Sequence, residues 1–119
     1  MATGTIAALH ISAGGWLRKI DVAPDNLAAA INCRHTETAD LRHNTAVYFD
    51  ARSTMMEREP NLAAVNLLID CGGHHPDTVP IPCGDVLVVG VDPITGRPAD
   101  LARHQYEAMA HALLASLAA

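Results

Sequence analysis

Residues 85–91 read Asp85-Val86-Leu87-Val88-Val89-Gly90-Val91, and this apolar run decides the fold that we expect. Gly84 precedes the run and Pro93 follows it, so it is bounded by residues that interrupt regular structure. A strand that is covered on both faces of a sheet has this composition, because its side chains point away from water in both directions. We therefore expect residues 85–91 to form the central strand of a sheet.

Four further strands are predicted from two pairs of segments. In residues 5–11 and 16–22 the side chains alternate with the two-residue period of a strand, and Gly14 and Gly15 supply a tight connection. Residues 36–41 and 45–51 are also strand-like, and Asn44 lies between them, where Asn tolerates the backbone of a turn. Both pairs predict β-hairpins.

Three helices are predicted from helix-start residues followed by apolar side chains at helical spacing. Pro24 presets the first helix, which we expect to end near Cys33. Asn61 can cap the second helix, which Gly72 and Gly73 end, and the third runs from Asp100 to the end of the chain. The residues expected on the apolar faces are Leu27, Ala28, Ala30 and Ile31, then Leu62, Val65, Leu68 and Ile69, and finally Tyr106, Met109, Ala110, Leu113 and Leu117.

The predicted order of elements is ββαββαβα, with residues 73–84 as a loop and residues 92–96 as a turn. A chain of 119 residues lies near the commonest size of one domain, and half of its residues are apolar. We therefore expect residues 1–119 to form a single α+β domain. Its sheet is expected to be mostly antiparallel, with the helices covering it.

Composition argues against several classes of function. The formal net charge is -5 and only 3% of the residues are aromatic, which disfavours direct binding to nucleic acid. No apolar run approaches the roughly 20 residues that a membrane-spanning helix needs, so no membrane insertion is expected. Three cysteines form an odd number, and no secretory leader is seen at the start of the sequence. Reduced thiols and a cytoplasmic location are the expectation.

Four segments carry a resemblance to a known family. They are the strand pair Ala8-Leu9-His10-Ile11 and Lys19-Ile20-Asp21-Val22, the helix start Pro24-Asp25-Asn26-Leu27, the segment Glu59-Pro60-Asn61-Leu62-Ala63-Ala64, and Cys83-Gly84-Asp85-Val86-Leu87-Val88-Val89-Gly90. In these segments the chain resembles a family of small proteins of actinobacteria, their plasmids and their phages that is catalogued as a domain of unknown function. The resemblance implies a setting associated with phages or mobile elements, and it implies no activity.

The cysteines and several histidines form the chain's most chemically suggestive cluster. Zinc prefers thiolate and imidazole ligands, often delivered as close pairs on turns, and Cys71 and His74 have such a spacing. The candidate ligands are Cys33, His35, Cys71, His74, His75 and Cys83. Their spacing matches none of the recurring zinc templates, so incidental packing residues are the favoured interpretation and zinc is the alternative.

A second alternative is a small cysteine-dependent enzyme. Cys83 lies next to a proline-rich loop that carries histidines, and a nucleophilic thiol needs such a base. A buried, inert thiol explains the same residue, and the sequence leaves open whether any catalysis occurs. His10 alternates with apolar neighbours and is expected to face solvent or a partner.

The favoured hypothesis is a small, non-enzymatic accessory protein that binds a protein partner or a small ligand. It rests on two observations, namely an apolar core that is sufficient for folding and the lack of a residue set in the sequence that clearly matches a catalytic site. No phosphate-binding loop is present, because the glycine pairs lack the spacing and the Lys-Ser/Thr of such a motif. A homodimer is part of this hypothesis, because antiparallel sheets of this size often leave an edge or a face to be covered.

Overall fold

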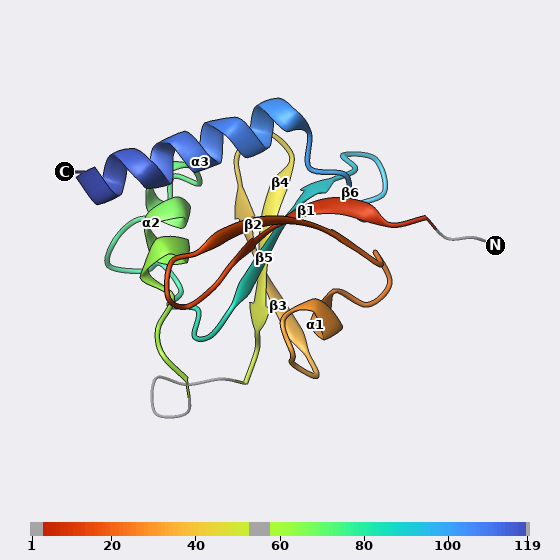
Figure 1. The fold of residues 1–119 in the computed structure, drawn as a ribbon, viewed down its shortest axis with the longest axis horizontal. Helices are drawn as coiled ribbons and strands as arrows, with labels where there is room; N and C mark the ends of the chain where they lie inside the picture. The colour runs from red at the N-terminus through yellow and green to blue at the C-terminus, as the bar shows by residue number, and fades with distance from the viewer. Residues whose placement is uncertain (1–3, 53–57, 119) are drawn as a thin grey trace.

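The computed structural model describes residues 4–52 and 58–118, with side chains described as far as Ala115. Its elements are β1 (Ile6–Ile11), β2 (Leu17–Val22), α1 (Leu27–Ala30), β3 (Thr36–Leu41), β4 (Thr45–Asp50), α2 (Leu62–Asp70), β5 (Val86–Val91), β6 (Pro98–Ala99) and α3 (Arg103–Ala118) (Figure 1). Within the described ranges, no helix has both the length and the apolar character to cross a membrane.

The strands form one antiparallel sheet with the order β2-β1-β5-β4-β3, and β6 pairs with β5. The predicted α+β class is confirmed, and β5 is the central strand that the run 85–91 predicted. The predicted order ββαββαβα is incomplete, because it lacks β6. This strand has only two residues and begins with Pro98, so it is too short to produce an alternating pattern.

The alternation of side chains along β5 divides the core into two clusters, one on each face of the sheet. Val86 and Val88 belong to a larger cluster with buried residues of α2 and α3, whereas Leu87 and Val89 belong to a smaller one with Leu27 of α1. In Figure 1, α3 lies above the sheet and α1 below it. The side chains of Val86, Leu87, Val88 and Val89 are all fully buried, and this explains why these four positions carry no polar residue.

Helix α2 presents a different face to the sheet from the one expected. The residues that it buries are Ala64, Leu67 and Leu68, while Leu62 is 65% exposed. Of the predicted set, Leu68 is buried as expected, Val65 and Ile69 are half-buried, and Leu62 was wrongly placed in the core. On α3, Met109 and Leu113 are buried as expected, and the side chain of Leu117 lies outside the described residues.

Two helices are shorter than predicted, and the backbone shows why. Helix α1 ends at Ala30, because Asn32 takes a left-handed conformation with a φ of 54°. Helix α3 begins at Arg103 because the preceding residues are held against the sheet, where the backbone N–H of Leu101 donates to the carbonyl of Ala7 at 2.9 Å. Gly90 allows this approach, since a Cβ there would collide with the carbonyl oxygen of Asp100.

The buried side chain of Asn61 connects three elements. Its Nδ2 donates to the carbonyl of Ile11 at the end of β1, at 3.0 Å, and to the carbonyl of Gly84 just before β5, at 2.9 Å. Its Oδ1 accepts from the backbone N–H of Ala64 at 3.1 Å and so caps α2. One fully buried amide therefore fixes where α2 begins and which face of the helix meets the sheet.

Replacing this amide should strongly destabilise the fold. We expect Asn61→Ala to lower the free energy of unfolding by roughly 3 kcal/mol, because two buried carbonyls lose their donor and the helix loses its cap. Asn26 is a matched control, since it is exposed, stands at the same position before α1 and makes no capping bond. Asn26→Ala should change the free energy by less than about 0.5 kcal/mol. Urea denaturation measures both variants, and equal losses would contradict this role of Asn61.

Candidate functional site

A tight turn at the tip of the first hairpin places the only tryptophan of the chain at the surface. Ser12 N–H donates to the carbonyl of Trp16 at 2.9 Å, and Gly15 N–H donates to the carbonyl of Ser12 at the same distance. Gly15 has a φ of 90°, as a three-residue hairpin loop with a bulge requires. Trp16 N–H also donates to Ser12 Oγ at 3.0 Å. The indole is left 80% exposed.

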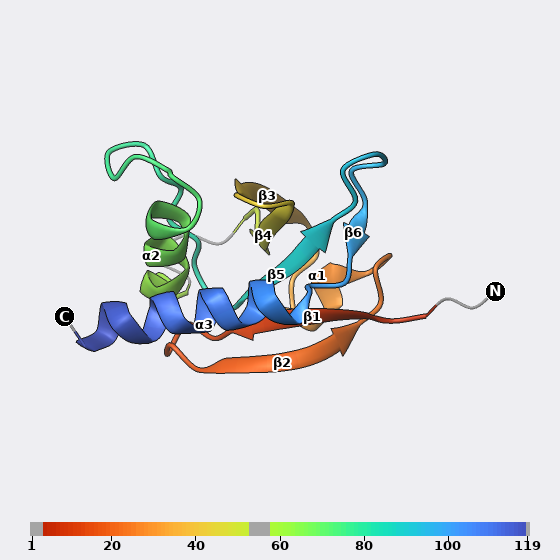
Figure 2. The ribbon, with the colours of Figure 1, turned by 90° about the horizontal axis from the view of Figure 1, so that it is seen from above.

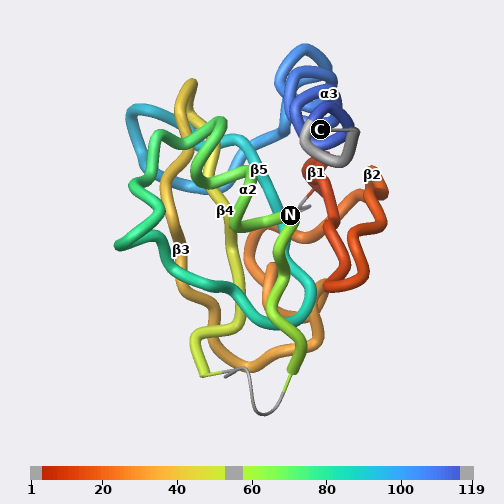
Figure 3. Tube along the Cα trace, turned by 90° about the vertical axis from the view of Figure 1, so that its left-hand side faces the viewer, coloured from red at the N-terminus to blue at the C-terminus, as the bar shows by residue number. Residues whose placement is uncertain are grey.

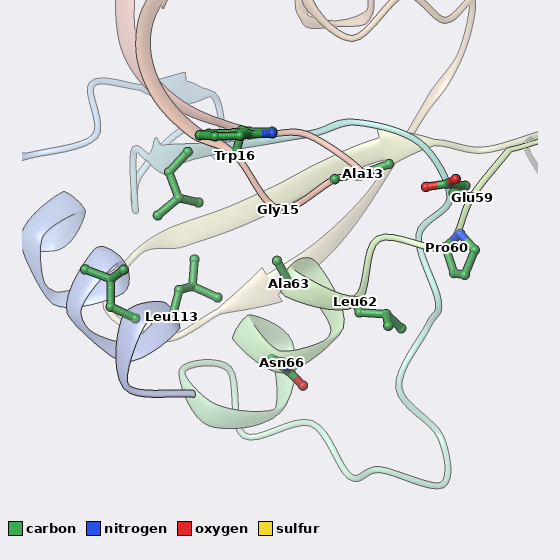
Figure 4. A pocket seen from close by; sticks show the side chains of 12 residues that line it. Ala13, Gly15, Trp16, Glu59, Pro60, Leu62, Ala63, Asn66 and Leu113 are labelled. Atoms are coloured by element: carbon green, nitrogen blue, oxygen red, sulfur yellow. The ribbon is translucent and has the colours of Figure 1, made fainter. Parts of the chain in front are cut away.

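The indole forms one wall of a groove whose volume is about 730 Å³. The opposite side comes from the first turn of α2 and from the C-terminal half of α3. Figure 4 shows Ala63 and Leu113 pointing toward Trp16 across the hollow, with Glu59 and Pro60 at one end. Leu113 and Ala63 also pack in the larger core cluster, so the floor of the groove is continuous with the core.

Exposed apolar side chains gather at this groove. Five large hydrophobic side chains are exposed in the described part of the chain, namely Trp16, Leu62, Ile81, Ile94 and Leu114. Three of them line the groove: Trp16, Leu62 and Leu114, the last of which is 61% exposed. Among the described residues that line it, Glu59 is the only charged one. A convergent apolar surface of this kind is typical of an interaction site.

A histidine–aspartate pair holds the hairpin turn beside the groove. His10 Nε2 lies 3.0 Å from Asp85 Oδ2, and Asp85 Oδ1 accepts from the backbone N–H of Ala13 at 3.1 Å. The expectation that His10 faces solvent or a partner is wrong, because its side chain is buried and meets a carboxylate 75 residues further along the chain. The turn contains Ala13 and Trp16, and the histidine–aspartate pair holds it against the start of β5.

The candidate zinc ligands lie in different places. Cys33 and His35 line a polar hollow with Arg58, Cys71 lines a separate hollow with His104, and Cys83 is buried. The ring of His74 bonds the carbonyl of Asp40 at 2.7 Å, and His75 Nδ1 accepts from the backbone N–H of Asp77 at 3.1 Å. Across residues 4–52 and 58–118, no three His, Cys, Asp or Glu side chains come together as a metal site. Zinc binding gains no geometric support and stays a prediction.

In the part of the chain that the structure describes, the groups around Cys33 and Cys71 do not activate these thiols as nucleophiles. Burial raises the pKa of the Cys33 thiol, and the carboxylate of Asp50 raises it further. Burial likewise raises the pKa of Cys71, with Asp70 adding to the effect. A catalytic thiol needs a lowered pKa and access to substrate, whereas Cys83 is almost completely buried.

Comparison with known proteins assigns neither a family nor a function. No family model, no curated protein and no solved structure matches this chain. The resemblance described above therefore stays a prediction from the four sequence segments.

The groove was not anticipated from the sequence. Leu62 was expected in the core, and Trp16 was expected only as the first residue of the strand 16–22. The signal that could have pointed to the site is a tryptophan directly after the Gly14-Gly15 turn, where a large side chain has few neighbours to cover it. The contributions of Leu62 and Leu114 depend on how three distant segments meet.

Thiol labelling tests the cysteine chemistry. Because the pKa values of Cys33 and Cys71 are raised, each has a smaller thiolate fraction at neutral pH than a free cysteine. We expect both to react slowly with iodoacetamide at neutral pH and faster as the pH rises, and Cys83 to react only after unfolding. Timed labelling followed by peptide mass spectrometry gives each rate, with the denatured chain as control. A cysteine that reacts faster than the denatured control at neutral pH would restore the enzyme hypothesis.

Proposed function

We propose that this protein is a non-enzymatic binding module that takes up an apolar segment of a partner protein in the groove beside Trp16. The observation that carries the proposal is that, of the five large hydrophobic side chains exposed in the described part of the chain, three converge on one hollow. Covering a large apolar side chain contributes about 1.5–3 kcal/mol, so three such contacts supply useful affinity. Tryptophan is also among the residues that most often dominate binding energy at interfaces.

The composition of the groove favours a protein segment over a small metabolite. Sites for metabolites combine apolar walls with a few convergent polar groups that fix the orientation of the ligand. Among the described lining residues, the polar side-chain groups are the carboxylate of Glu59, the amide of Asn66 and the indole N–H of Trp16, and Asn66 already has an interaction of its own. The apolar face of a helix, or two or three neighbouring apolar side chains, match this surface better.

The setting that we propose is that of an accessory protein of a phage or mobile element acting on a host protein. Support comes from the four segments that resemble the plasmid and phage family, and the three free cysteines are compatible with a reducing compartment. The net charge of -5 favours a protein partner over nucleic acid.

Variants of the groove test this function against a matched control. Leu114→Ala should weaken binding roughly tenfold, because a contact of about 1.5 kcal/mol is lost, and Trp16→Ala should weaken it at least as much. Ile94 is 92% exposed, does not line the groove and lies in the turn before β6, so Ile94→Ala should leave binding unchanged. A first readout is energy transfer from Trp16, the sole tryptophan, to bound anilinonaphthalene sulfonate in wild type, Leu114→Ala and Ile94→Ala.

A photo-crosslinking amino acid placed at Leu62 or at Ile94 provides the second readout. The proposal expects proteins captured from cells through position 62 that are not captured through position 94. Equal capture at the two positions, or dye binding that Leu114→Ala and Ile94→Ala affect equally, would contradict it.

A further inference from the structure

The two edges of the sheet differ in how they are protected. Strand β3 carries Glu37 and Asp40 and no positive charge, and the ring of His74 bonds the Asp40 carbonyl at 2.7 Å. Strand β2 carries both signs, with Arg18 and Lys19 followed by Asp21. Figure 2 and Figure 3 show β2 as the outermost described element on its side, whereas the loop after α2 passes outside β3. Charged side chains and a covering loop are usual protections of an edge strand. Both edges carry charged residues, but in the described part of the chain only β3 also has a loop over it.

The hairpin determines which groups of β2 face outward. The bond from Ser12 N–H to the Trp16 carbonyl identifies these residues as a hydrogen-bonded pair. Hydrogen-bonded and non-bonded pairs alternate along an antiparallel ladder, so Arg18 and Ile20, opposite His10 and Ala8, direct their backbone groups toward β1. The backbone N–H and C=O groups of Leu17, Lys19 and Asp21 therefore point away from the sheet. A further strand can form hydrogen bonds with them there.

Among the registers centred on Arg18, Lys19, Ile20 or Asp21, the charges on β2 favour one way for a second copy of the strand to pair with it. In an antiparallel pair related by a two-fold axis, residues with outward backbone groups must lie opposite one another. This condition is met only when the axis passes beside one residue of the strand, which then lies opposite its own copy. An axis beside Arg18, Lys19 or Asp21 places that residue opposite its own copy, which sets like charges against each other. An axis beside Ile20 instead places Lys19 opposite Asp21 of the second copy, twice.

The side chains fit this register on both faces of the sheet. Lys19 Nζ lies 6.0 Å from the centre of the Tyr106 ring, so Lys19 and Asp21 lie on the face that α3 covers. Ile20 lies on the opposite face, half-buried against the smaller core cluster. An axis beside Ile20 thus extends that cluster through an isoleucine pair and places two ion pairs on the other face.

We propose that two copies of this chain associate through β2, antiparallel and about a two-fold axis beside Ile20, so that their sheets become continuous. The interface uses the outward backbone groups of Leu17, Lys19 and Asp21, the Ile20 pair and the two Lys19–Asp21 pairs. It does not depend on the groove, so this proposal and the proposed function can fail separately.

Exchanging the charges tests the register. Lys19→Asp and Asp21→Lys each place like charges opposite one another twice, and each should weaken the dimer at least about tenfold. The double variant Lys19→Asp/Asp21→Lys restores both pairs in reversed orientation and should recover most of the affinity. Glu37→Lys on β3 changes the charge of the other edge and should leave association unchanged. Sedimentation equilibrium over a range of concentrations measures each, and circular dichroism shows that each variant is folded.

Disulfide trapping tests the same register independently of charge. Ile20→Cys brings two thiols together in a non-hydrogen-bonded pair, whose Cα atoms lie about 4.5 Å apart, within disulfide range. Mild oxidation should give a covalent dimer of this variant and none of wild type or Arg18→Cys.

Three outcomes would overturn the proposal. They are a wild-type chain that stays monomeric at all concentrations, a double charge variant as weak as the single ones, or Arg18→Cys crosslinking as readily as Ile20→Cys. A dimer that Leu114→Ala dissociates while the charge variants leave it intact would equally overturn it, by placing the interface at the groove.

Discussion

The fold and the groove both depend on the buried amide of Asn61. Its hydrogen bonds to the carbonyls of Ile11 and Gly84 join the ends of two neighbouring strands, and its bond from Ala64 N–H starts α2 at the same point. A fully satisfied buried polar group specifies one arrangement, because every alternative leaves part of it unpaired. The turn after β1 and the first turn of α2 are the walls of the groove, so the same amide sets their separation.

The sequence predicted the parts of the fold that rest on local patterns. The run 85–91, the alternation in the first hairpin and the strand-like segments of the second hairpin identified the five longer strands, because burial on one or two faces affects which residue types a strand contains. The phase of α2 was wrong at Leu62, although Leu68 is buried as predicted, because the predicted set also has helical spacing. The burial of Asn61, which chooses between the two phases, depends on contacts with residues 50 and 23 positions away.

Other differences between the predictions and the structure also come from long-range contacts. Strand β6 is too short to have a pattern, although a glycine inside the apolar run was a sign that another segment of backbone comes close at Gly90. His10 was placed on the surface because its partner, Asp85, stands just before β5, 75 residues further along the chain. The cysteines and histidines attracted attention for their chemistry, whereas the groove is built from residues that the sequence marks only as apolar.

Trp16 directly precedes β2, and this short separation links the groove to the proposed dimer. With the axis beside Ile20, the two tryptophans are eight strand positions apart, a span of roughly 27 Å. A partner that offers two apolar segments across this span would engage both grooves at once. Its second contact would then form at an effective concentration near the millimolar range, which multiplies a modest affinity for each segment by roughly 100-fold or more. Such a protein would discriminate between single and repeated targets by their spacing.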